Sequence, residues 1–307
     1  MQKSFETPEE FDRALKRAVS ESGGSGDLYR QMLRDRFLCR VFSGGDTGFV
    51  LKGGSGLLAR ISDARATRDV DFATRGDADP ERVMGRLSEL VSRDLGDWCR
   101  FELTKMEEAI DENGYSRLLK LRYVTFIGEE EKDPVLIDLS LDCSTTQPPE
   151  RVSPANRVEI AGVDTCDYLV YPLPDQLADK LCAIMEVQPG GWPSSRMKDL
   201  VDVVTYVTHE TFSLAQLSLA VESECARRGM DIPEGFAAPS SWEPRFRAFA
   251  RKNGMPGEYC ALDAASRLAS DFFGPALLND SSMDARWDRA NLRWVGFTTD
   301  DLPSKEE

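Results

Sequence analysis

The order of apolar and polar residues predicts two helices at the beginning of the chain. The first spans residues 7–19, where Thr7 can cap the helix and Pro8 suits its first position. Its apolar residues lie four apart and share one face: Phe11, Leu15 and Val19. A Gly/Ser-rich break at residues 20–26 follows, and helical spacing resumes over residues 28–42 with arginines on the expected solvent side.

Short apolar runs and alternating segments next predict a mixed α/β sheet. A run that begins at residue 49 enters a glycine turn and a short helix, and a further helix is expected at residues 80–95 with Asp79 as its N-cap. The remaining strand candidates are residues 69–72, 100–105, 117–127, 135–141 and 158–160. Turns are expected at residues 113–114 (Asn-Gly) and 133–134 (Asp-Pro).

From residue 174 onward the pattern becomes helical. The predicted helices are residues 174–187, 197–208, 212–228, 243–250 and 258–273. The sequence therefore predicts an α+β protein of two domains. Residues 1–170 form a domain of two N-terminal helices and a mixed sheet, and residues 171–307 form a helical C-terminal domain, with the boundary expected between about residue 164 and residue 174.

Composition narrows the chemistry. The seven cysteines are scattered and never form a C-x-x-C pair, which argues against a disulfide framework or a zinc site. The one histidine, His209, excludes any mechanism that needs two imidazoles and argues against a Ser-His-Asp or Cys-His centre. No apolar run approaches the roughly 20 residues that span a bilayer, and no secretory signal precedes residue 7, so a cytoplasmic protein without a membrane partner is expected.

The net charge of -15 argues against an all-over basic nucleic-acid binder, because phosphate contacts need lysine or arginine along the strand. The net charge still allows a local basic patch that binds nucleic acid. Basic residues concentrate near the N-terminus, and they are Arg13, Lys16, Arg17, Arg30, Arg34, Arg36 and Arg40. This patch is either an acceptor-binding surface or a set of solvated helix faces.

Three aspartates carry the predicted chemistry. Asp69 and Asp71 alternate on one strand and therefore project from one face, and Asp138 on a neighbouring strand can join them. Converging carboxylates need a cation, and hard oxygen ligands suit Mg²⁺ held together with a substrate triphosphate. The alternatives are a surface strand, a sugar-nucleotide site for the D-x-D pair, and a strand-end aspartate bonded to the backbone for Asp138.

A glycine turn lies upstream of these aspartates. The turn opens a helix, so the N–H of Gly54 and the hydroxyl of Ser55 can receive the β and γ phosphates at a positive helix end. The structural alternative is a tight turn into a helix.

A second group of charges lies in the helical region. Lys180 stands beside an apolar stripe, and its ammonium is expected to reach a cleft and bind phosphate as a point charge. Asp199 and Asp202 are three apart on one helix face, and Lys198 lies on an adjoining face. The alternative is an amphipathic helix with solvated charges.

Four motifs together resemble those of the AbiEii/AbiGii nucleotidyltransferase toxins, including the MenT group, over residues 45–205. They are Leu51-Lys52-Gly53-Gly54-Ser55-Gly56-Leu57, Arg65-x-Thr67-x-Asp69-Val70-Asp71-Phe72, Leu177-Ala178-Asp179-Lys180-Leu181 and Arg196-x-Lys198-Asp199-x-x-Asp202. The resemblance implies a DNA polymerase β-like nucleotidyltransferase fold with a helical C-terminal domain. It also implies a toxin with a cognate antitoxin, which transfers nucleotides from a nucleoside triphosphate to the 3′ acceptor end of tRNA and so stops aminoacylation and translation.

The resemblance also implies residue roles. Asp69 and Asp71 would hold Mg²⁺, Lys180 would contact the triphosphate, and Asp202 would complete the active centre. Thr67 stands at a hydroxyl position that in some relatives is phosphorylated, which is associated with silencing. The substrate-binding candidates are Gly54, Ser55, Thr67, Arg196, Lys198 and Asp199.

Other functions stay open on the sequence. The acceptor could be a protein side chain or a small molecule such as an aminoglycoside, or the chain could be a non-catalytic nucleotide-binding regulator. A cluster of three carboxylates argues against a pure binder, since such a cluster is costly without a cation.

Overall fold

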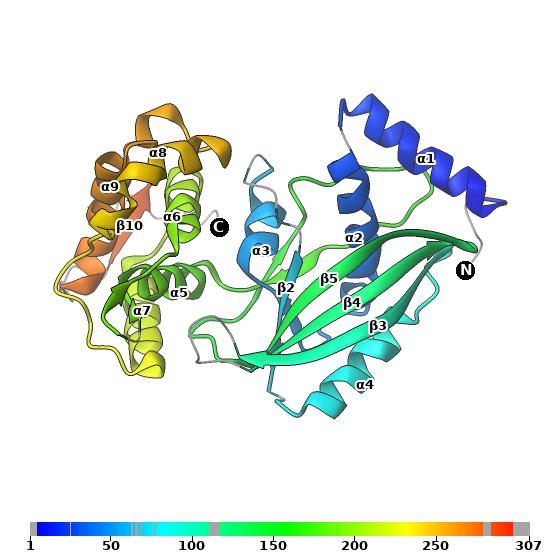
Figure 1. The fold of residues 1–307 in the computed structure, drawn as a ribbon, viewed down its shortest axis with the longest axis horizontal. Coiled ribbons are helices and arrows are strands. Elements are labelled where there is room, and N and C mark those ends of the chain that lie inside the picture. Colours follow the sequence, from blue (N-terminus) through cyan, green and yellow to red (C-terminus); the bar gives the residue numbers. More distant parts are fainter. Residues whose placement is uncertain are drawn as a thin grey trace, which may run out of the picture. The chain divides into compact units, whose positions relative to one another are not determined.

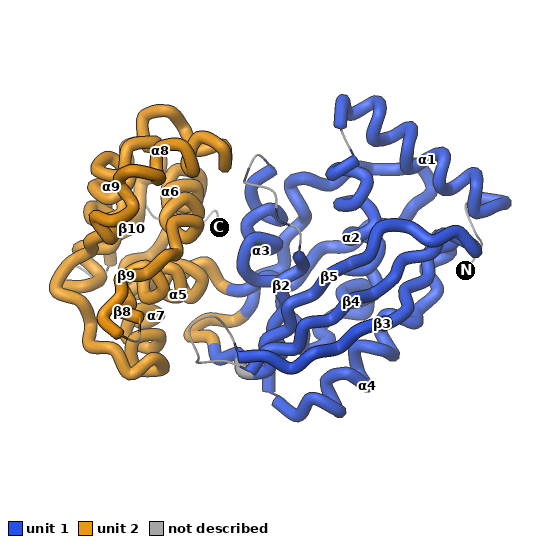
Figure 2. The backbone as a smooth tube through the Cα atoms, in the orientation of Figure 1, with its two compact units in different colours: residues 1–144, 149–171 blue, residues 145–148, 172–307 orange. Residues whose placement is uncertain are grey.

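The computed structural model describes residues 5–24, 26–62, 64, 67, 69–76, 78–110, 117–188, 190–278 and 284–296. The chain forms two compact units (Figure 2). Unit 1 comprises residues 1–144 and 149–171, and unit 2 comprises residues 145–148 and 172–307.

Unit 1 is built on a seven-stranded mixed sheet with the order β3-β4-β5-β2-β1-β7-β6 (Figure 1). Its strands are β1 (Phe49–Leu51), β2 (Asp69–Arg75), β3 (Cys99–Ile110), β4 (Arg117–Ile127), β5 (Glu130–Cys143), β6 (Glu150–Val152) and β7 (Tyr168–Val170). The β2–β5 and β1–β7 pairs are parallel, and the other neighbours are antiparallel. The sheet therefore brings β2 beside β5, although the two are far apart in sequence.

The α-helices described in unit 1 are α1 (Pro8–Glu21), α2 (Gly26–Phe42), α3 (Gly53–Arg60) and α4 (Pro80–Val91). Two of them, α1 and α4, begin at their predicted N-caps. Thr7 Oγ1 accepts a hydrogen bond from the backbone N–H of Glu10 at 3.2 Å, and Asp79 Oδ1 accepts one from Arg82 at 3.0 Å. Both predicted N-caps are thus confirmed.

Helix α2 covers one face of the sheet. The ring of Phe37 lies 5.2 Å from that of Phe101 in β3 and 5.1 Å from that of Tyr123 in β4, measured between centroids. Phe42 of the same helix lies 5.8 Å from Phe72 in β2. Because strand side chains alternate, the residues next to these aromatics point to the opposite face of the sheet.

Arg36 and Arg40 correct the expectation of a solvated arginine face on α2. Both side chains are buried, with Arg40 only 1% exposed. Arg36 Nε lies 2.6 Å from Asp97 Oδ2, and Arg40 Nη2 lies 2.6 Å from Asp97 Oδ1. Burial would raise the pKa of Asp97, but the two guanidinium groups lower it. Both arginines therefore form ion pairs inside unit 1. The basic residues of the N-terminal segment thus do not share one surface.

Other local predictions differ from the structure. Residues 158–160 form no strand, although Val158 and Ile160 pack on the core of unit 1. Strand β5 runs through residues 133–134, and the turn before it falls at Gly128, which has a left-handed φ of 59°. The turn predicted at residues 113–114 lies outside the described residues.

Unit 2 is mainly helical. Its α-helices are α5 (Leu173–Met185), α6 (Met197–His209), α7 (Leu214–Arg228), α8 (Glu243–Lys252) and α9 (Leu262–Leu277), and its 3-10 helices are η1 (Ser240–Trp242) and η2 (Gly257–Tyr259). Two small hairpins were not predicted: β8 (Val187–Gln188) with β9 (Trp192–Pro193), and β10 (Ala285–Asp288) with β11 (Arg293–Gly296). The predicted fold class, a mixed-sheet domain with a helical C-terminal part, is confirmed.

Aromatic packing joins the second hairpin to the helices of unit 2. The ring of Trp287 in β10 lies 4.9 Å from Phe272 in α9, and Phe272 lies 5.0 Å from Phe212. The indole N–H of Trp287 donates to the backbone carbonyl of Val207 at 2.7 Å, so its polar atom is satisfied inside the core.

Within the described part of the chain, no helix is both long and apolar enough to cross a membrane. All seven cysteines carry free thiols.

Candidate active site

A glycine turn in unit 1 is fitted around Asp71. Gly53 has a φ of 58°, and a Cβ at this position would overlap Asp71 Oδ2. The N–H of Gly54 donates to Asp71 Oδ2 at 3.0 Å, and the N–H of Lys52 donates to the carbonyl of Asp71 at 2.8 Å. Only glycine allows both the left-handed backbone and this close approach, so the first glycine of the motif positions a carboxylate.

The hydroxyls of the predicted phosphate seat bond to strand β2. Ser55 Oγ donates to the carbonyl of Asp69 at 3.0 Å, and the N–H of Asp71 approaches Ser55 Oγ at 3.4 Å. Thr67 Oγ1 also donates to the carbonyl of Asp69, at 3.2 Å. Ser55 is 9% exposed. Ser55 thus fixes the aspartate-bearing strand to α3, whereas the bond of Thr67 is local. The contact of these hydroxyls with a triphosphate stays a prediction.

The sheet register places two of the three aspartates side by side. Asp71 in β2 is the direct partner of Asp138 in β5, and Asp69 is the partner of Leu136 one pair along. The three carry the same alternation and therefore lie on the face opposite α2. Directly opposed residues have Cβ atoms about 5 Å apart, and like charges in this position are destabilising. The two carboxylates therefore repel each other, and a cation bound between them would relieve that repulsion.

Two opposed carboxylates fit a Mg²⁺ ion, which takes oxygen ligands and is commonly held by one or two carboxylates together with substrate phosphates. Across the described residues, no group of three or more His, Cys, Asp or Glu side chains is close enough to hold a metal ion. The structure thus pairs Asp71 with Asp138. Asp69 lies on the same face, but the three described carboxylates do not form one metal-binding cluster.

Basic residues that were not singled out from the sequence lie next to this pair. Lys120 in β4 is the direct partner of Asp138, and Arg122 is the partner of Leu136. Both side chains are exposed, whereas Leu121 and Tyr123 are buried. The alternation of buried and exposed residues over 119–123 could have identified Lys120 and Arg122 from the sequence. It puts both cations on the face of Asp138 once β4 pairs with β5.

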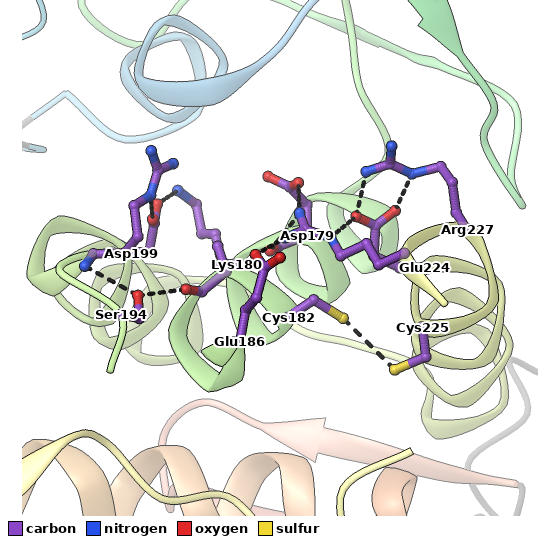
Figure 3. Close-up of polar contacts among 12 residues, drawn as sticks. Asp179, Lys180, Cys182, Glu186, Ser194, Asp199, Glu224, Cys225 and Arg227 are labelled. Atoms are coloured by element: carbon purple, nitrogen blue, oxygen red, sulfur yellow. Dashed lines mark hydrogen bonds and ion pairs between the residues drawn. The ribbon is translucent and has the colours of Figure 1, made fainter. Parts of the chain in front are cut away.

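The second charge cluster lies inside unit 2. Lys180 Nζ is 2.6 Å from Asp202 Oδ2 and 3.0 Å from Asp199 Oδ1, and Lys180 and Asp199 face each other in Figure 3. Arg196 Nε lies 2.6 Å from Asp199 Oδ2. Lys180 is 3% exposed, Asp199 3% and Asp202 0%, so the cluster is internal. It joins α5 to α6.

The charges of this cluster compensate one another. Burial alone would lower the pKa of Lys180, but Asp202 and Asp199 outweigh it and the pKa is raised. Burial would raise the pKa of Asp199, but Lys180 and Arg196 lower it to about 2. Lys180 and Asp199 are therefore both charged near neutral pH, and each has a partner of opposite charge.

This burial corrects two expectations. The amphipathic helix with solvated charges is wrong, because Lys180, Asp199 and Asp202 are internal. The ammonium of Lys180 was expected to reach a cleft, but it is held between two carboxylates. Lys198 is half-buried, and within the described residues it makes no ion pair. The substrate roles of these residues stay predictions.

A neighbouring network that the sequence did not suggest anchors the same helix. Arg228 in α7 pairs with Asp179 Oδ1 at 2.6 Å and with Glu224 Oε1 at 2.7 Å, and its side chain is 1% exposed. Glu224 also pairs with Arg227, as Figure 3 shows. Asp179 of the recognised motif thus ties α5 to α7 beside Lys180.

The motif aspartates Asp69 and Asp71 lie on β2, next to the glycine turn that begins α3. A family model described as nucleotidyl transferase AbiEii toxin, type IV toxin-antitoxin system, matches residues 36–291 of the chain. The chain therefore belongs to the AbiEii family of nucleotidyltransferase toxins. The match extends well past residue 205 into the C-terminal third, where no motif was recognised in the sequence.

Two solved structures are similar at low identity. JHP933 from Helicobacter pylori is 17% identical, with 84% of this chain and 96% of that chain covered and a TM-score of 0.45. MenT4, a nucleotidyltransferase toxin from Mycobacterium tuberculosis H37Rv, is 17% identical, with 91% and 99% covered and a TM-score of 0.47. The family assignment rests on the family model. A comparison with curated protein sequences gave no match.

Proposed function

We propose that this toxin is a Mg²⁺-dependent nucleotidyltransferase that transfers a nucleotide from a nucleoside triphosphate to the 3′ acceptor end of tRNA. The acceptor 3′-oxygen would bond to the α-phosphorus while the bond to pyrophosphate breaks. The observation that carries the proposal is the register pair of Asp71 and Asp138, two like charges on one sheet face beside the first turn of α3. Membership of the AbiEii family supports the reaction class.

Each residue has a proposed part in this reaction. Asp71 and Asp138, with Asp69 beside them, would hold the metal. Bound divalent cations would supply activation of the attacking hydroxyl and stabilisation of the leaving pyrophosphate. The N–H of Gly54, already aimed at Asp71 Oδ2 at 3.0 Å, would keep that carboxylate oriented.

The remaining motif residues would serve the triphosphate. Ser55 would hold β2 against α3, Thr67 would hold the residues before β2, and the positive N-terminal end of α3 would favour phosphate. In unit 2, Lys180 and Asp202, together with Arg196, Lys198 and Asp199, would form the positioning and phosphate-binding cluster that the family resemblance implies.

Modification of the tRNA 3′ end would prevent aminoacylation and therefore stop translation in the cytoplasm. Family membership implies a nucleoside triphosphate substrate and an antitoxin partner. The antitoxin would keep this activity in check.

The test is incubation of the purified protein with total tRNA and each α-labelled nucleoside triphosphate in turn, with and without Mg²⁺, and in parallel with lysate protein. We expect label on tRNA only when Mg²⁺ is present. Asp71→Asn should lower the transfer rate by at least about 100-fold, because it removes a ligand and not merely a support of a ligand.

Asp133→Asn is the matched control. Asp133 is an exposed aspartate of β5, the strand that carries Asp138, and its ion pair with Arg30 is half-exposed. It should transfer at the wild-type rate. Label on protein with none on RNA would overturn the acceptor, and full activity of Asp71→Asn would overturn the site.

A further inference from the structure

The sheet face that carries the paired aspartates continues into a basic surface on β4. Lys120 is the register partner of Asp138, and Arg122 lies two residues along the same strand. Both side chains are exposed on the face opposite α2. A row of carboxylates and a row of cations therefore lie side by side on neighbouring strands of unit 1.

The cations of this surface are placed at a cost. Lys105 in β3 is the direct partner of Arg122, and like charges in directly opposed positions destabilise a sheet. Lys105 Nζ is paired with Glu107 Oε1 at 2.7 Å. Within the described residues, Lys120 and Arg122 make no ion pair, although the chain has a net charge of -15. Lys120 lies directly opposite Glu107 in β3 and Asp138 in β5, whereas Arg122 lies opposite Lys105 and Leu136. Arg122 is therefore the better placed of the two to bind an anion from outside, and Lys120 would bind one beside its neighbouring carboxylates.

An aromatic platform lies farther along the same face. Phe126 is the register partner of Arg100, whose guanidinium carbon lies 4.3 Å from the centre of the ring. Arg100 also pairs with Glu102. Six residues of β4 separate Lys120 from Phe126, which corresponds to about 20 Å of extended strand. Phenyl rings and guanidinium planes stack unpaired RNA bases, and lysine and arginine bind the phosphates between them.

We propose that the single-stranded 3′ end of the acceptor RNA lies along β4. Its phosphates contact Lys120 and Arg122, a base farther from the 3′ end stacks at Phe126, and its 3′-hydroxyl lies beside Asp71 and Asp138. This inference rests on the proposed function, because it gives the acceptor strand of that same site a path and a direction. Charge complementarity selects the occupant, because RNA phosphates would bind Arg122, which lies opposite Lys105, and Lys120, which makes no ion pair within the described residues.

The test compares two double variants that each remove two exposed charges. Lys120→Gln/Arg122→Gln changes the proposed surface, and Arg13→Gln/Arg17→Gln changes the outer face of α1, which is the alternative basic patch. Binding of a tRNA transcript and of a short single-stranded RNA is measured over a salt series. The KM for tRNA and the affinity for nucleoside triphosphate are measured beside it.

For Lys120→Gln/Arg122→Gln we expect the KM for tRNA to rise at least about tenfold, with no matching change in triphosphate affinity. The slope of log affinity against log salt should become shallower by about 1.4 on single-stranded RNA, since each lost phosphate contact contributes about 0.7. Arg13→Gln/Arg17→Gln should keep the wild-type KM and slope.

Three results would overturn the inference while leaving the proposed function standing. The first is an equal KM for tRNA in the two double variants, measured while the wild-type protein labels tRNA. The second is a larger rise in KM for Arg13→Gln/Arg17→Gln. The third is loss of antitoxin binding by Lys120→Gln/Arg122→Gln with its RNA binding and KM unchanged. Failure of the wild-type protein to label any RNA would instead sink the proposed function.

Discussion

The two charge clusters of this toxin follow opposite rules. In unit 1, Asp71 and Asp138 put like charges side by side on an outer sheet face. In unit 2, Lys180 lies between Asp199 and Asp202, so opposite charges meet inside the protein. The unit 2 cluster is complete without a ligand, whereas the two carboxylates of the unit 1 pair repel each other unless a cation binds between them.

This difference teaches how to divide roles among residues that belong to the same set of motifs. A group whose charge is compensated inside the protein stabilises the fold and can position its neighbours. A carboxylate that the fold places beside another carboxylate is a better candidate for binding a cation. Substitutions should therefore separate the clusters, with stability lost in unit 2 and activity lost in unit 1.

The largest stability effect is expected for Lys180→Met, which should lower the free energy of unfolding by about 3–5 kcal/mol. Methionine fills a similar volume but removes the ammonium that lies between the buried carboxylates of Asp199 and Asp202. Chemical denaturation followed by tryptophan fluorescence would measure the loss, because Trp242 and Trp287 are core residues of unit 2. A loss below about 1 kcal/mol would mean that the ammonium is solvated and that the comparison fails.

Two further variants sharpen this measurement. Lys180→Met/Asp202→Asn removes one stranded charge, so it should be less destabilised than the sum of its single changes by at least about 1 kcal/mol. Asp71→Asn should change stability by no more than about 1 kcal/mol, because it breaks no compensated pair. Stability losses of equal size in both units would remove the distinction.

An intermediate effect is expected for Gly53→Ala. A left-handed backbone costs a non-glycine residue about 1–2 kcal/mol, and the added methyl group would overlap Asp71 Oδ2. The displaced carboxylate should also slow nucleotide transfer. Denaturation and the transfer assay measure the two effects together.

Gly85→Ala is the matched control. Gly85 lies in α4 with a right-handed backbone, and a Cβ there would meet nothing within 4 Å. This change should raise stability by about 0.5–1 kcal/mol, because alanine favours the helix interior. Equal behaviour of the two alanine variants would show that Asp71 does not depend on the turn.

The sequence predicted elements whose signals are local. Helix α1 has its expected N-cap, Thr7. Strand β4 has the expected limits, Arg117–Ile127, because its side chains alternate over the whole strand. The turn expected at residues 133–134 was wrong because Pro134 lies where the β4–β5 register shifts, near Tyr123 and Thr125. A bulge tolerates proline within a strand, and only the pairing partner reveals it.

The strand predicted at residues 158–160 was wrong for a related reason. Val158 and Ile160 reach the core with their side chains, so they show strand-like alternation without a strand partner. For the candidate site, alternation was sufficient to expect Asp69, Asp71 and Asp138 on one face. The burial of Lys180, Asp199 and Asp202 was not predictable, since charged residues are rarely buried and their pairing needs α5 beside α6.

The smallest effect tests the like-charge pair itself. Without divalent cations, Asp138→Asn should change the free energy of unfolding by less than about 1 kcal/mol, since it removes repulsion from Asp71 and attraction to Lys120 together. Added Mg²⁺ should raise the melting temperature of the wild-type protein, because a cation that binds only the folded state stabilises it. The variant should gain less from Mg²⁺, and Asp133→Asn, on the same strand, should respond as the wild type does. An Asp138→Asn variant destabilised by more than this, with an unchanged Mg²⁺ response, would mean that this aspartate supports the fold, as Asp199 does, and that the two clusters are alike.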